Sequence, residues 1–160
     1  MLGTLLPGAR QLQNIHPLIV HFPIAFLFGA ALLYLLAWLA KRESWAWTGL
    51  WLLSLGTLGA AAAVASGLYG AEGVMVARSV REHLLVNHQR IMLGVLALSV
   101  VLSAWAWLAR PIPHRGGVVF LFLLAILIAG LTVGADFGGR MVYDYNAGGN
   151  ACPQPIEFHD

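Results

Sequence analysis

Cysteine and charge are both scarce in this chain. Cys152 is the single cysteine among 160 residues, which excludes an internal disulfide, a cysteine-based zinc finger and the Cys-x-x-Cys-His signature of covalently attached haem. Charged residues make up 10% of the sequence, against about a quarter in a typical soluble domain. The formal net charge of +2 is too small to indicate a nucleic-acid partner. The composition is therefore not that of an ordinary soluble protein.

Long apolar runs take the place of charge. Hydrophobic residues account for 59% of the chain, and the mean hydropathy is +0.77. Four runs, at about residues 18–40, 47–69, 91–109 and 118–135, are each long enough to cross about 30 Å of hydrocarbon as a helix. They predict an all-α fold, an integral membrane four-helix antiparallel bundle over residues 1–146. The remaining residues, 147–160, are expected to form an irregular C-terminal tail.

The connections and the tryptophans support this topology. Residues 41–44 and the proline-containing residues 110–117 separate spans one from two and three from four. The longer second connection is expected to hold a short amphipathic helix over residues 74–80. Six tryptophans are predicted to form an aromatic belt at one membrane interface. They are Trp38, Trp45, Trp47, Trp51, Trp105 and Trp107.

Two short segments each carry a pair of histidines five residues apart. HPLIVHFP, at residues 16–23, opens the first span, and HLLVNH, at residues 83–88, precedes the third. The first and third helices of an antiparallel bundle start on the same side, so these four histidines are expected at one end of it. Ionisable residues are costly inside a membrane bundle and mark a functional site. Facing imidazoles there most often hold a metal, in particular the iron of haem.

The inner histidine of each pair is the better candidate for a ligand. Five residues of helix correspond to a rise of about 7.5 Å and a rotation of about 140°, so the two members of a pair differ in depth and face. We predict His21 and His88 as axial ligands of haem iron. His16 and His83, nearer the interface, are expected to act as secondary ligands or to contact the haem propionates.

Two further residue types complete the predicted site. Arg81 and Arg90 are placed to pair with propionates, or alternatively to extend toward lipid headgroups. Gly67 and Gly134 provide clearance for a flat macrocycle, or alternatively simple close packing of helices. Imidazoles also suit copper and zinc, so a site for one of these ions is a competing interpretation.

Catalytic motifs are missing from the sequence. It contains no Gly-x-Ser-x-Gly, His-Glu-x-x-His or phosphate-loop pattern. We therefore expect a protein that is not catalytic alone, namely an electron-transfer subunit of an oxidoreductase complex.

Four stretches of the sequence resemble one known family. They are HPLIVHFPIA at residues 16–25, ASGL at 65–68, HQR at 88–90 and GGRMVY at 138–143. Over about residues 15–149 the chain is similar to the bacterial membrane family called domain of unknown function 2231. The resemblance implies a four-helix, cytochrome-b-like unit associated with periplasmic dehydrogenases or c-type cytochromes, and hence membrane electron transfer. The tail at 147–160 departs from the family's glycine-rich ending.

Together these observations predict a multi-pass protein of the bacterial inner membrane that binds b-type haem. It would relay electrons between a periplasmic redox partner and quinone, or another haem of a respiratory-type complex. The basic loops at the tryptophan end favour that end as cytoplasmic, which makes both termini periplasmic. The competing class is a cofactor-free accessory or assembly subunit of a membrane redox complex.

Overall fold

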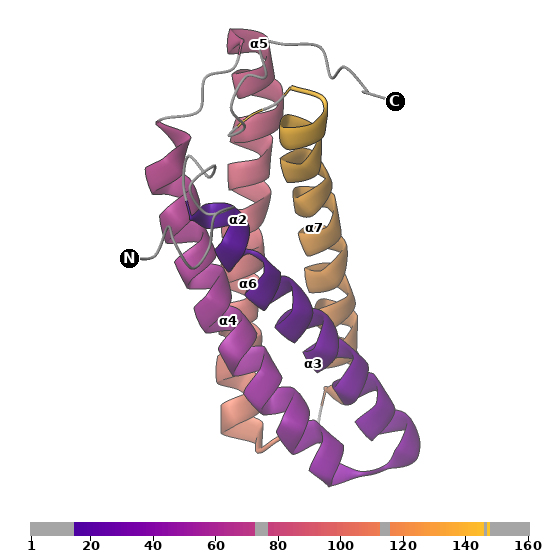
Figure 1. The fold of residues 1–160 in the computed structure, drawn as a ribbon. Helices are drawn as coiled ribbons and strands as arrows, with labels where there is room; N and C mark the ends of the chain where they lie inside the picture. Colours follow the sequence, from indigo (N-terminus) through magenta and orange to yellow (C-terminus); the bar gives the residue numbers. More distant parts are fainter. Residues whose placement is uncertain (1–14, 73–76, 113–115, 146, 148–160) are drawn as a thin grey trace, which may run out of the picture.

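The computed structural model describes residues 15–72, 77–112, 116–145 and 147, and it is all-helical there. Four long apolar helical segments pack side by side as a bundle (Figure 1). Each is long and apolar enough to cross a membrane: His16–Ala40, Glu43–Ala71, Arg78–Ala109 and Gly117–Tyr143. The predicted fold class, a bundle of four candidate membrane helices, is confirmed.

Two of the four segments contain a local irregularity. The first consists of α2 (His16–Ile19) and α3 (His21–Ala40), which are separated at Val20. The second segment is the single helix α4 (Glu43–Ala71) and the fourth is α7 (Gly117–Tyr143). The third runs through α5 (Arg78–Val80), the π-helix η2 (Arg81–Leu85) and α6 (Val86–Ala109). Wider π turns inside an α-helix are frequent at functional sites.

The main core runs along the bundle between the helices. It contains fourteen buried residues, among them Leu27 and Tyr34 of α3, Leu50 of α4 and Leu124 of α7. At one end the Tyr34 hydroxyl donates a hydrogen bond to the carbonyl oxygen of Pro111, at 3.3 Å. The link after α6 is thereby tied to the first helix.

Glycines allow α3 and α4 to approach closely. A Cβ atom added at Gly56 would lie 2.7 Å from a methyl group of Leu27, and one at Gly59 would lie 3.1 Å from the Pro23 ring. Small residues let membrane helices pack in this way without a hydrophobic driving force between them. Gly56 and Gly59 therefore serve helix packing.

Hydroxyl groups join α4 to α6. The hydroxyl oxygens of Thr57 and Ser103 lie 2.9 Å apart, and the Trp107 indole N–H donates to the hydroxyl of Ser54 at 3.0 Å. Interhelical hydrogen bonds of this kind stabilise membrane bundles by about 0.6 kcal/mol each.

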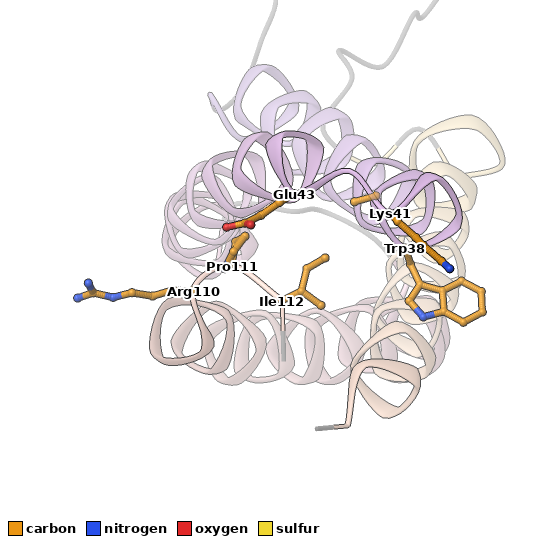
Figure 2. A pocket seen from close by; sticks show the side chains of 7 residues that line it. Trp38, Lys41, Glu43, Arg110, Pro111 and Ile112 are labelled. Carbon is orange, nitrogen blue, oxygen red and sulfur yellow. The ribbon is translucent and has the colours of Figure 1, made fainter. Parts of the chain in front are cut away.

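The tryptophans gather at one end of the bundle, as predicted. They lie at the end of α3, the start of α4 and the end of α6, and the rings of Trp51 and Trp107 meet edge to face with centroids 5.4 Å apart. This end also holds a cavity of about 300 Å³ between the first two helices and the link after α6. Figure 2 shows Glu43, Pro111 and Ile112 at this cavity and the Arg110 side chain directed away from it.

The helices extend further than the predicted apolar spans. The third begins at Arg78, and the fourth continues through Gly138 and Gly139 to Tyr143. Of the amphipathic helix expected over residues 74–80, residues 74–76 lie outside the described part, and Arg78–Val80 begin the third segment itself. Apart from Ala147, the predicted tail also lies outside the described residues.

Candidate functional site

Two histidines meet between the first and third helical segments. His16 is the first residue of α2, and His88 lies in the first turn of α6. Their ring centroids are 6.5 Å apart, and the ring planes are nearly perpendicular, at 87°. Both residues are half-buried. One histidine from each of the two spans thus lies beside the other at one end of the bundle, whereas all four were expected to meet there.

Helix α7 fixes the His88 ring. The ring nitrogen Nδ1 lies 2.7 Å from the carbonyl oxygen of Gly134. A carbonyl oxygen only accepts, so Nδ1 carries the proton, and in a neutral imidazole Nε2 then carries the lone pair. A Cβ atom at Gly138 would lie 3.2 Å from Cε1 of the ring, so this glycine lets α7 pass directly beside it.

Helix α4 fixes the His16 ring in the same way. Nδ1 lies 3.0 Å from the hydroxyl oxygen of Ser66, and that hydroxyl donates its own proton to the carbonyl of Ala63, at 3.0 Å. The backbone of Ala63 also takes part in a hydrogen bond with His16, so Ser66 and Ala63 of α4 together hold this ring. A Cβ atom at Gly67 would lie 2.9 Å from Cε1 of the ring.

The two rings share one feature with histidines that bind a metal. A ligating imidazole usually donates its second ring N–H to a carbonyl, carboxylate or hydroxyl, which sets the tautomer and orients the ring. Two metal–nitrogen bonds of about 2.1 Å would place two opposed nitrogens about 4 Å apart and their ring centres about 6 Å apart. The observed separation of 6.5 Å between His16 and His88 fits that requirement. The two donors present are thus of the right chemistry and spacing for one metal ion.

The expected pairing of His21 with His88 is not what the structure shows. His21 is exposed, and His16 takes the position facing His88. The reason is the register of the two helical segments: the first begins at His16, whereas the third begins ten residues before His88, at Arg78. His83 is exposed as well, on the π-helix beyond the pair. The structure therefore brings together one outer and one inner histidine.

The two arginines lie apart from one another. The Arg81 guanidinium donates to the carbonyl oxygen of Ala71 at 3.1 Å and so ties the third segment to the last residue of α4. Arg90 is exposed on α6. Arg81 thus contributes to the packing of this end, while Arg90 lies on the outer surface of the bundle.

The predicted clearance at Gly67 and Gly134 is filled by side chains of this protein. His16 occupies the space at Gly67, and a Cβ atom at Gly134 would lie 2.6 Å from the terminal methyl of Met92. Both glycines therefore bring helices and rings together. Their contribution to the site is to position the two imidazoles.

Sequence reasoning did not identify Ser66 and Gly138 as site residues. Both lie within stretches that carried the family resemblance, ASGL and GGRMVY. One signal in the sequence could have found Ser66. An imidazole that binds a metal needs a hydrogen-bond partner for its second nitrogen, and this partner must lie at the same depth in the bundle. Ser66 lies in the last turns of the second span, toward the histidine end, and its hydroxyl met this condition.

Comparison with known proteins returns one family. Residues 12–151 match the family described as "Predicted membrane protein (DUF2231)". The matched range includes all the described helices and both histidines of the pair. No curated protein and no solved structure matches the chain.

Proposed function

The chain belongs to the DUF2231 family of predicted membrane proteins, and from its paired histidines we propose that it is a membrane electron-transfer subunit that holds b-type haem between His16 and His88. The family assignment agrees with the resemblance seen in the sequence, and it makes the chain a membrane protein with four candidate transmembrane helices. The observation that supports haem is the pair of neighbouring imidazoles, each with its Nδ1 atom hydrogen-bonded to another helix.

The number of protein donors favours haem over a bare ion. The pair supplies two imidazole donors, and haem iron takes no more than two ligands from protein. Structural zinc takes four ligands and catalytic zinc three from protein. Haem would supply one-electron redox chemistry when bound, whereas the chain brings the two imidazoles together and orients their rings through Gly134 and Ser66.

The ligand pair proposed here differs from the one predicted from the sequence. His88 is retained, and His16 replaces His21 because it is the residue whose ring faces His88. His21 becomes a matched control, since it lies on the same helical segment and is exposed. Arg90, exposed two residues after His88, is proposed as a partner of a haem propionate at the surface.

The side of the membrane on which a soluble partner would meet the site follows from the proposed orientation. The loops at the tryptophan end carry Lys41, Arg42 and Arg110, and basic loops favour the cytoplasmic side. The histidine end then faces the periplasm of a bacterial inner membrane. We propose that electrons pass between a periplasmic protein, such as a c-type cytochrome or dehydrogenase, and quinone or a second haem in a larger complex.

Haem and metal content of the purified protein test this proposal. The full chain is expressed with an adequate haem supply and extracted in mild detergent, and haem, iron, copper and zinc are quantified per chain. Haem in stoichiometric amount, with a reducible α-band, supports the proposal. Copper or zinc without haem would identify the competing ion site, and protein free of all of these would point to an accessory or assembly subunit.

A further inference from the structure

The exposed side chains of the third segment change in character at the level of His88. From Arg78 to Arg90 every exposed residue is polar or charged. These residues are Arg78, Ser79, Glu82, His83 and Arg90. Beyond Arg90 all of them are apolar: Leu93, Gly94, Ala97, Val100, Val101, Ala104, Trp107 and Leu108. A lipid-facing helix surface is apolar, so the surface suited to hydrocarbon begins just after Arg90.

Helix α7 changes in the same way at the same level. From Val118 to Val133 its exposed residues are apolar except for Thr132, whose hydroxyl donates to the Ile128 carbonyl of its own helix. The next exposed residues are Asp136 and Arg140, and the latter pairs with Asp144 at 3.6 Å. The hydrogen bond from His88 to Gly134 places this second transition level with the first. On two neighbouring helices exposed charged residues therefore begin at the depth of the histidine pair, and on α7 the exposed Val142 and Tyr143 lie beyond it as well.

The distance to the tryptophan belt agrees with this boundary. About 19 residues of α4 separate Ser66, beside His16, from Trp47, which is about 28 Å of helix. The hydrocarbon core of a bilayer is about 30 Å thick, and tryptophans favour its interface. If the hydrocarbon layer begins at the tryptophan end, its other boundary therefore lies at the level of His16 and His88.

Helical structure continues past this level and has a core of its own. A second cluster of buried residues joins the end of α4, the start of the third segment and the end of α7. Its members are Ala71, Val80, Leu84, Leu85 and Met141, with Phe137 and Ala147 packed against them. We call this part the cap. In Figure 1 the α5 end of the third segment and the end of α7 rise beyond α2, which carries His16.

We propose that the His16–His88 site lies at the hydrocarbon boundary beneath a water-exposed cap, and that a water-soluble redox protein exchanges electrons with it from that side. The second half of this statement rests on the proposed function, because it requires a redox group between the histidines. The first half rests only on the exposed residues, the helix lengths and the second core. Electron exchange from water suits this depth, since exposed charged residues begin there on both the third segment and α7.

Two valines provide a matched test of the boundary. Val142 in the cap is 47% exposed, and Val100 in the middle of α6 is 49% exposed. In a Cys152→Ser background, Val142→Cys and Val100→Cys are each placed in lipid nanodiscs, where both membrane faces are open to solvent. A membrane-impermeant maleimide is expected to label the thiol at 142 and to leave the one at 100 unlabelled until detergent unfolds the protein. Protection of both thiols would overturn the boundary.

The second half of the proposal is tested with the wild-type protein in sealed proteoliposomes. External impermeant maleimide labels Cys152 only on molecules whose histidine end faces outward, and this gives the outward fraction. An impermeant reductant added outside should reduce the same fraction of the haem. Reduction that does not follow the Cys152 fraction would overturn approach from water. Protein that lacks haem but shows the valine labelling pattern would remove the proposed function and leave the boundary in place.

Discussion

The carbonyl oxygen of Gly134 accepts a hydrogen bond from the His88 ring at 2.7 Å. Close approach of α6 and α7 makes this contact possible. A Cβ atom added at Gly134 would lie only 2.6 Å from the terminal methyl of Met92, so a larger residue would push the helices apart. One glycine thus determines both the distance between two helices and the tautomer of a histidine. The same combination recurs at Ser66 and Gly67 beside His16.

The histidines themselves give the first prediction. His16→Ala and His88→Ala should each abolish six-coordinate haem, whereas His21→Ala should retain it, because His16 is the residue that faces His88. Absorbance spectra of the three variants, normalised to membrane-inserted protein, measure this. If six-coordinate haem were lost in His21→Ala and retained in His16→Ala, the ligands would be His21 and His88, as predicted from the sequence.

The difference between the predicted pair, His21 and His88, and the observed pair, His16 and His88, shows which features of the site could be predicted from the sequence. Apolar runs and alternating helix direction were enough to predict the bundle and to place histidines of spans one and three at one end. The register was not predictable from the sequence, because it depends on contacts between distant segments, such as those of Val80, Leu84 and Leu85 in the cluster with Met141. No hydropathy pattern reports such a contact between distant segments.

The length of α7 has a similar explanation. Gly138 and Gly139 lie beyond the predicted apolar run at 118–135, and glycine disfavours helix by about 1 kcal/mol. The helix continues because Gly138 packs against the His88 ring, at 3.2 Å from its Cβ position. A tertiary contact outweighs the local preference, and only the fold shows it.

Ser66 gives the second prediction. Ser66→Ala removes the hydrogen-bond partner of His16 Nδ1, and loss of such a partner typically weakens metal binding about 10- to 100-fold. The imidazole also becomes a weaker electron donor, so the haem midpoint potential should rise. A redox titration measures this shift, which loss of packing alone would not produce. Ser54→Ala, at the tryptophan end, is the control and should leave both quantities unchanged.

Helix packing gives the third prediction. A Cβ atom at Gly56 would meet Leu27 at 2.7 Å, so Gly56→Ala should destabilise the bundle by about 1–3 kcal/mol. Gly94 has no atom within 4 Å of its Cβ position, so Gly94→Ala should be neutral, or stabilising by up to about 1 kcal/mol. Unfolding in mixed detergent measures both variants. Equal losses of stability would show that the α3–α4 contact is not specific.

Membrane orientation gives the fourth prediction. The fourth candidate span ends at Tyr143, at the histidine end, and the proposed orientation has this end in the periplasm. A membrane-impermeant maleimide should therefore label Cys152 in intact spheroplasts. Labelling only after the membrane is opened would reverse the orientation and place the redox partner in the cytoplasm.

The most direct test of the central claim is near-infrared magnetic circular dichroism of the oxidised, purified protein. This measurement identifies the two axial ligands of low-spin haem iron from one spectrum. Because the rings of His16 and His88 face each other with both Nδ1 atoms hydrogen-bonded, the account predicts the band of bis-imidazole ligation, lost in His88→Ala and kept in His21→Ala. A protein without this band, or one whose band survives His88→Ala, would contradict it.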